Sequence, residues 1–116
     1  LFKRNIFSLK QTQNLIREIK KYSNNKKFPI LIDEEGSTVS RLTNIYSHQL
    51  NAKYFGDLYE KDKKSAVFIY KNYIKSLCKI LRKTGFNINT IPVLDVIRSN
   101  TNKIIGVRSF SNKKKL

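Results

Sequence analysis

The stretch Ile30–Leu42, ILIDEEGSTVSRL, decides how this sequence is interpreted. It begins with three apolar residues, becomes acidic at Asp33 and continues as a polar loop. A second stretch, Gly85–Phe110, repeats this order, because its apolar run Ile91–Leu94 leads directly to Asp95. In parallel α/β sheets, functional residues lie just beyond the carboxyl ends of the strands. Two strands that each end in a carboxylate therefore predict one site built by neighbouring loops.

The rest of the chain alternates between helical and strand patterns. Ser8 and Gln11 have the spacing of a capping box before an apolar helical face. Repeated strand–helix–strand units predict a right-handed parallel α/β sheet with its helices outside. The expected order is a strand end at Leu1–Ile6, a helix from Ser8 to Ser23, a strand at Phe28–Ile32 buried on both faces, an irregular loop from Glu34 to about Glu60, a helix from Asp62 to Gly85, a strand at Phe86–Val96 and a loop at Ile97–Phe110.

The chain is strongly basic, with 24 Lys and Arg against 8 Asp and Glu and a formal net charge of +16. Such a charge raises nucleic acid or an anionic membrane as a partner. However, the basic residues are spread along the chain, and the abundant Lys, Asn and Ile are typical of an A/T-rich coding sequence. We therefore expect no specific nucleic-acid partner. One basic stripe is expected on the solvated outer face of its helix, at Lys71, Lys75, Lys79 and Lys83.

Neither cysteine nor histidine content predicts a cofactor or a metal. The single cysteine, Cys78, fits a reducing compartment and falls in an apolar helical pattern that predicts a buried, inert thiol. The single histidine, His48, has no second histidine or cysteine at ligand spacing. No P-loop, dinucleotide-binding glycine motif or nucleophile elbow is present. No apolar run approaches the ~20 residues of a membrane span. We expect a cytoplasmic protein that uses no cofactor.

Three consecutive acids, Asp33, Glu34 and Glu35, are the best candidates for a site. Neighbours on a strand point to opposite sides, so Asp33 and Glu35 should share a direction that Glu34 does not. Gly36 permits a turn after them. Arg41 is within reach of a loop that folds back, and an Arg facing a carboxylate can clamp the hydroxyls of a polar ligand. The alternative is that Asp33 caps a loop while Glu34 and Glu35 face water.

Asp95 and Arg108 have alternatives of the same kind. Asp95 could simply accept backbone N–H bonds in the turn after Val96, because the residues around it are apolar. Arg108 stands alone in a loop, where Arg is usually solvent-facing.

These residues resemble the N-terminal barrel of family 3 glycoside hydrolases, specifically bacterial β-N-acetylhexosaminidases. That family carries a pattern close to D-x-E-G-G-R-V-x-R, which here reads DEEGSTVSR at Asp33–Arg41. It also carries a pattern like N-x-x-x-A-P-V-L-D-V followed by I-G-x-R-S-F. Here these read NINTIPVLDV at Asn87–Val96 and IGVRSF at Ile105–Phe110. The opening LFKRNI is similar to the family's LF-x-R-N, so the resemblance covers essentially all 116 residues in order.

The resemblance implies that residues 1–116 are a fragment of one (β/α)₈ TIM barrel, covering about its second to fourth strands. It implies that Asp33, Arg41 and Arg108 bind hydroxyls of a terminal N-acetylhexosamine. We expect Glu35 and Asp95 to support these residues. The implied reaction is retaining hydrolysis of cell-wall fragments, with an Asp nucleophile and a His acid/base. Both belong to motifs like S-D-D and K-H-F-P-G-H-G, which this sequence lacks. We assign no catalytic residue, and the chain alone is predicted to be inactive.

Two departures from the family pattern affect the loop. Ser37 replaces the family's second Gly, and Thr38 replaces the Arg after it. If the backbone at Ser37 has positive φ, the replacement costs roughly 1 kcal/mol. Both ends of the chain have the character of cuts through a longer protein. The alternative function is a non-catalytic basic protein that binds nucleic acid or an anionic polymer. The sequence leaves the glycan and the oligomeric state open.

Overall fold

The computed structural model describes residues 1–98 and 103–113. Residues 99–102, within the expected loop Ile97–Phe110, and the terminal residues 114–116 lie outside the described residues. The elements in chain order are the 3-10 helix η1 (Lys3–Asn5), α1 (Leu9–Tyr22), β1 (Leu31–Ile32), α2 (Ala52–Lys61), α3 (Lys63–Thr84), β2 (Ile88–Asn89) and the 3-10 helix η2 (Gly106–Arg108).

The predicted boundaries of the two main helices are confirmed. Ser8 caps α1 by accepting a hydrogen bond from the Gln11 backbone N–H. The Gln11 side chain accepts from the Phe7 N–H instead of Ser8, so only half of the expected capping box forms. Asp62 caps α3 by accepting from the Ser65 N–H, and Gly85 ends α3 with φ +111°. These ends follow local rules that the sequence displays directly.

Two expected elements are wrong. The loop expected from Glu34 to about Glu60 contains α2, which Asn51 caps through the Tyr54 N–H. The strand end expected at Leu1–Ile6 is the short 3-10 helix η1. The terminal amine of Leu1 nevertheless lies at β1, where it donates to the Leu31 carbonyl over 2.7 Å.

The sheet consists of β1 and β2, which pair in parallel with Leu31 opposite Ile88. Regular strand is much shorter than the expected Phe28–Ile32 and Phe86–Val96, although backbone bonds from Asn87 to Ile30 and from Thr90 to Ile32 flank the paired residues. The described residues thus combine helices with a two-stranded parallel sheet, compatible with the expected α/β class. The described residues do not form a closed barrel, and the (β/α)₈ barrel remains a prediction.

The helices cover only one face of this sheet. Ile32 is 0% exposed and belongs to the core with Ile16, Leu77 and Leu81 of α1 and α3. Leu31, on the other face, is 46% exposed, and its partner Ile88 is 42% exposed. The expected burial on both faces is therefore wrong for the described residues.

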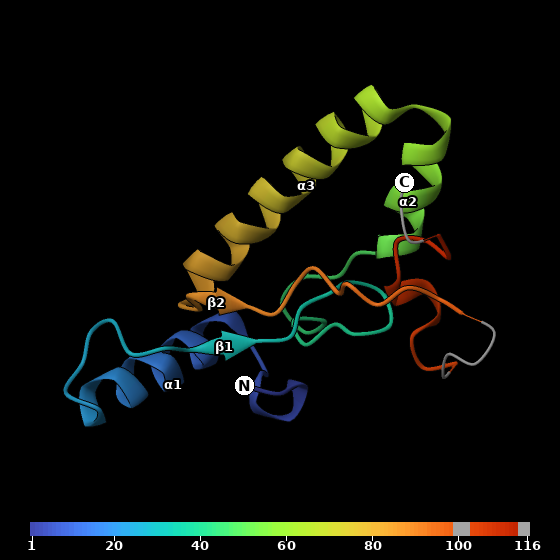
Figure 1. The fold of residues 1–116 in the computed structure, drawn as a ribbon. Helices are drawn as coiled ribbons and strands as arrows, with labels where there is room; N and C mark the ends of the chain where they lie inside the picture. Colours follow the sequence, from blue (N-terminus) through green and yellow to red (C-terminus); the bar gives the residue numbers. More distant parts are fainter. Residues whose placement is uncertain (99–102, 114–116) are drawn as a thin grey trace.

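Helix α2 packs beside the N-terminal part of α3, α3 then runs to the sheet, and η2 in the C-terminal segment packs against α2 (Figure 1). The basic stripe at Lys71, Lys75, Lys79 and Lys83 is exposed, as predicted. Cys78 on the same helix is also exposed, so the predicted buried thiol is wrong. The apolar face of α3 is narrower than the sequence pattern indicates, and Cys78 lies outside it. No helix among the described residues has the length and apolar character needed to cross a membrane.

Candidate functional site

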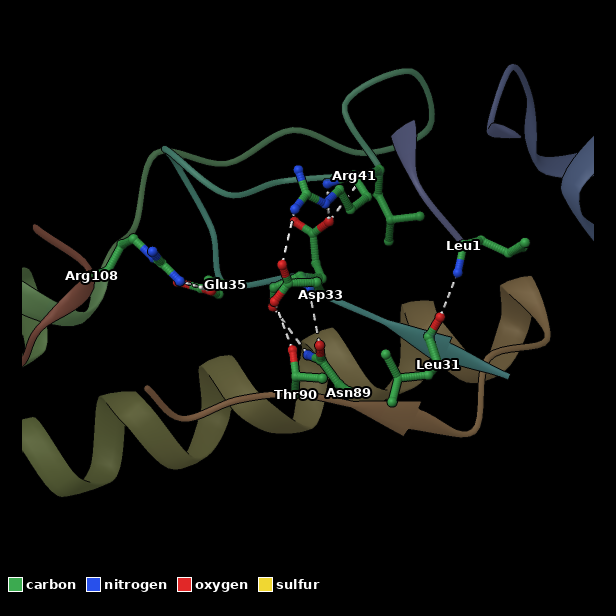
Figure 2. Close-up of polar contacts among 10 residues, drawn as sticks. Leu1, Leu31, Asp33, Glu35, Arg41, Asn89, Thr90 and Arg108 are labelled. Atoms are coloured by element: carbon green, nitrogen blue, oxygen red, sulfur yellow. Dashed lines mark hydrogen bonds and ion pairs between the residues drawn. The ribbon is translucent and has the colours of Figure 1, made fainter. Parts of the chain in front are cut away.

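The first part of the site is an ion pair at the carboxyl end of β1. Asp33 follows the last residue of β1, and its Oδ2 accepts from Arg41 Nη2 over 2.9 Å. Its Oδ1 accepts from the Thr90 hydroxyl over 2.7 Å, and Thr90 directly follows β2. Figure 2 shows Asp33 between Arg41 and Thr90. The predicted contact between Asp33 and Arg41 is confirmed, and the ends of both strands meet there.

These partners set the charge state of Asp33. Partial burial acts to raise the pKa of the Asp33 carboxyl, but hydrogen bonds from Thr90 and Arg41 and the charge of Arg41 outweigh it and lower that pKa below its usual value. Asp33 is thus held as a carboxylate, which is a hydrogen-bond acceptor only. Both charged side chains remain about one-third exposed, so a polar ligand can reach them.

The second part of the site is a bidentate pair between Glu35 and Arg108. Arg108 Nε and Nη2 each donate to a Glu35 carboxylate oxygen over 2.8 Å. Its hydrogen bonds with Glu35 raise the pKa of Arg108 further, against partial burial. Arg108 ends η2, so this pair ties the C-terminal segment to the loop after β1. The solvent-facing alternatives for Arg108 and Glu35 are therefore wrong.

Asp33 and Glu35 use neighbouring parts of the same loop, and each receives one arginine (Figure 2). The resemblance implies a shared sugar-binding role for Asp33, Arg41 and Arg108, and in the structure Arg41 pairs with Asp33 while Arg108 pairs with Glu35. Asp33 and Asp95 act on Arg108 only through their charges, which also raise its pKa. The Asp95 side chain is exposed, and its backbone carbonyl accepts from the Ser109 hydroxyl over 2.6 Å. Its expected supporting role remains a prediction.

The alternative in which Glu34 faces water is wrong, because the Glu34 side chain is buried. It is 0% exposed, and its Oε2 accepts the backbone N–H groups of Arg41 and Leu42 over 2.7 and 3.0 Å. Glu34 therefore joins the start of the loop at Asp33 to its end at Arg41 through buried hydrogen bonds. The alternation of side-chain direction along the acids was the available signal, since it sends Glu34 to the side opposite Asp33 and Glu35.

Two asparagines that the sequence analysis gave no role attach β2 to β1. The Asn89 side chain accepts from the Glu34 N–H and donates to the Glu34 carbonyl, both over 3.0 Å. Asn87 makes the same kind of clamp with the Ile30 N–H and the Phe28 carbonyl. An amide can replace a backbone partner in this way because it carries both a donor and an acceptor.

The loop bends through two residues with positive φ. Gly36 has φ +98°, and a Cβ there would overlap the Leu50 carbonyl oxygen and the His48 ring. Ser37 has φ +33°, in a region that costs L-residues other than Gly about 1–2 kcal/mol. Ser37, where the family pattern has Gly, thus does have the positive φ that makes a replacement of Gly costly. Arg41 nevertheless reaches Asp33.

Relatives named Beta-hexosaminidase match nearly all of this chain. It is 31% identical over 112 residues to "Beta-hexosaminidase" of Xanthomonas campestris pv. campestris (strain B100), covering 97% of this chain and 33% of the relative. The protein of that name from Stenotrophomonas maltophilia (strain R551-3) is 31% identical over 111 residues, covering 96% and 32%. That from Xylella fastidiosa (strain 9a5c) is 29% identical over 112 residues, covering 97% and 32%.

The chain spans about a third of the length of these relatives. No family model matches it. Among the described residues, no group of three His, Cys, Asp or Glu side chains is placed to hold a metal ion.

Proposed function

We propose that this chain forms part of the sugar subsite of a cytoplasmic β-N-acetylhexosaminidase of glycoside hydrolase family 3, in a (β/α)₈ barrel. The observation that carries the proposal is the Asp33–Arg41 pair at the carboxyl end of a parallel strand, joined by Thr90 from the next. Relatives named Beta-hexosaminidase support the same activity class. The substrate would be a glycan with a terminal N-acetylhexosamine, such as a cell-wall fragment under recycling.

The proposed roles follow from donor and acceptor chemistry. The Asp33 carboxylate accepts from a sugar hydroxyl, and the Arg41 guanidinium donates to a neighbouring hydroxyl oxygen. Arg108 donates to the same sugar residue, while Glu35 orients Arg108 through its bidentate contact. Asp95 supports Arg108 through its charge. An ion pair that is already formed presents both groups at fixed positions, which lowers the entropy cost of binding.

The nucleophile and the acid/base of a retaining reaction are not assigned to this chain. Its 116 residues contain neither the K-H-x-P-G-H nor the S-D-D pattern, and the His48 side chain is buried beside Glu34. In this proposal the chain contributes sugar-binding groups and no bond-breaking group.

The proposal is tested by titrating the ¹⁵N-labelled chain with N-acetylglucosamine and following its backbone amide resonances. We expect shifts centred on Asp33, Arg41 and Thr90, with a millimolar Kd (about −4 kcal/mol) for an incomplete subsite. Asp33→Ala should weaken binding at least tenfold. The matched control is Lys53→Ala, which removes an exposed ion pair with Asp57 on α2 and should change nothing. Equal affinity for wild type and Asp33→Ala would overturn the proposal.

A further inference from the structure

Beneath the Asp33–Arg41 loop lies a buried acid–imidazole contact that the proposed sugar subsite does not use. Glu34 is fully buried, and its Oε1 has no hydrogen-bond partner among the described residues. The His48 side chain is 7% exposed, and both its ring nitrogens also lack a hydrogen-bond partner there. His48 Nε2 lies 3.6 Å from Glu34 Oε1. Buried polar groups without a hydrogen-bond partner destabilise a fold, so closing this short gap is favoured.

The surroundings leave the His48 ring little freedom to turn elsewhere. Its centroid lies 5.4 Å from the rings of both Tyr46 and Tyr73. On another side it packs so closely on Gly36 that a Cβ there would overlap its Cε1. The ring is therefore confined between two aromatic side chains and the backbone of the site loop, with Nε2 toward Glu34.

Glu34 links this contact to the exposed site. Its Oε2 holds the Arg41 and Leu42 N–H groups, while Oε1 is the oxygen nearest His48. A carboxylate is planar, so fixing Oε1 also fixes the direction of Oε2. The two oxygens thus face different partners: Oε1 faces the His48 ring, and Oε2 binds the backbone of the loop.

We propose that His48 is a positioning residue, whose Nε2–H donates to Glu34 Oε1 and thereby holds the Arg41 backbone where its guanidinium meets Asp33. The role of Arg41 toward a sugar rests on the proposed function, whereas the anchoring of its backbone does not. An Nε2–H donor is present in the imidazolium and in one neutral tautomer, so the anchor needs no particular charge on His48. The rings of Tyr46 and Tyr73 pack on His48, and the Tyr73 hydroxyl is also buried without a hydrogen-bond partner among the described residues. Burial and, to a smaller extent, the nearby charge of Glu34 raise the pKa of the Tyr73 hydroxyl and keep it neutral.

The first test reads the wild-type protein directly, because His48 is the only histidine in the chain. A long-range ¹H–¹⁵N spectrum of the imidazole reports directly which ring nitrogen carries a proton. We expect a protonated Nε2 that is shielded from solvent exchange, and Glu34→Gln should shift its resonance. A ring whose only proton is on Nδ1 would overturn the proposal.

The second test separates the donor from the volume of the ring. His48→Phe keeps an aromatic ring between the tyrosines but removes the donor, whereas His48→Gln restores an N–H donor. We expect Arg41 and Leu42 amide exchange to accelerate about tenfold or more in His48→Phe, which corresponds to about 1.4 kcal/mol, and to recover at least in part in His48→Gln. Exchange at Ile16 in α1 should stay unchanged, as a control for the fold. Unchanged Arg41 exchange in His48→Phe, or no recovery in His48→Gln, would overturn the proposal.

Adding N-acetylglucosamine distinguishes this inference from the proposed function. If both hold, His48→Phe weakens sugar binding in parallel with the faster Arg41 exchange. If Arg41 exchange responds to His48 while Asp33→Ala leaves sugar affinity unchanged, the anchor stands and the sugar subsite does not.

Discussion

At Asp33, hydrogen bonds from Thr90 and Arg41 outweigh burial, so the pKa of its carboxyl should fall below the ordinary 3.8. A carboxyl whose pKa is lower in the folded than in the unfolded state contributes stability above its unfolded pKa, and this is lost as pH falls through the folded pKa. We expect Arg41→Ala to raise the Asp33 pKa and to shift this loss to higher pH. Titration of the Asp33 ¹³Cγ resonance measures both values, and an unchanged pKa in Arg41→Ala would contradict the ion pair. Because the pair is partly exposed, its free energy is expected to be about 1 kcal/mol or less.

Gly36 and Ser37 provide a second residue-scale prediction with opposite signs at neighbouring positions. Gly36→Ala introduces a Cβ at φ +98° against the Leu50 carbonyl and should lower the free energy of unfolding by more than about 2 kcal/mol. Ser37→Gly removes strain at φ +33° but adds unfolded-state entropy, so we expect a gain of at most about 1 kcal/mol. Urea unfolding of the three proteins measures the difference. Destabilisation by Ser37→Gly comparable to that by Gly36→Ala would show that backbone conformation does not govern this turn.

At the scale of the elements, the sheet has one covered face and one open face. Ile32→Ala should cost about 2–5 kcal/mol, because it leaves a cavity among the helices. Its neighbour Leu31 is half exposed, so Leu31→Ala should cost less than about 1 kcal/mol. Chemical denaturation of both variants checks this difference. Equal costs would mean that the Leu31 face is also buried, for example by association of the chain with itself.

The clamp of Asn89 on Glu34 is a second prediction about elements. Asn89→Asp keeps the size and the acceptor but removes the donor, and it places a charge beside the Glu34 carbonyl. We expect a loss of about 1–3 kcal/mol and faster exchange of the Glu34 amide. Asn44→Asp is the matched control, since the Asn44 amide donates to the Ile6 carbonyl and not to a residue of either strand. An equal effect on Glu34 exchange in both variants would contradict a specific clamp.

The elements also show which parts of the fold the sequence could predict. Ser8, Asp62 and Gly85 bound their helices through contacts within a few residues, so their roles are visible locally. The Asp33–Arg41 pair was predictable for the same reason, since one loop joins the two residues. The strand pairing depends on contacts such as that between Ile30 and Asn87, which are 57 residues apart. The pairing of Arg108 with Glu35 joins residues 73 apart. A single sequence holds no local signal for either contact. The burial of Glu34 depends on His48 and Leu42, which come together only once the loop has folded.

At the scale of the whole molecule, the charge of the site differs from the charge of the rest of the chain. The net charge is +16, yet three of the eight acids are consecutive in the site loop. Two of them are matched by Arg41 and Arg108, so the site has little net charge within a basic chain. The electrostatic field of the basic chain should therefore neither strengthen nor weaken the binding of a neutral glycan. We expect N-acetylglucosamine affinity to be nearly independent of salt from 50 to about 300 mM, because ionic screening acts on charged partners. Affinity that falls steeply with salt would instead support the basic, polyanion-binding alternative.

The last prediction concerns the activity of the chain alone. A retaining glycosidase needs a carboxylate nucleophile and an acid/base group whose pKa lets it donate a proton. Asp33 is held as a carboxylate by Arg41 and Thr90 and is therefore not suited to donate a proton, and both Glu35 carboxylate oxygens already accept from Arg108. The chain contains no K-H-x-P-G-H or S-D-D pattern to supply the missing groups. We therefore expect no release of 4-nitrophenol from 4-nitrophenyl N-acetyl-β-glucosaminide above the buffer rate. Asp33→Ala separates real turnover from a contaminant: activity that disappears in this variant contradicts the prediction, whereas activity that persists does not come from the site.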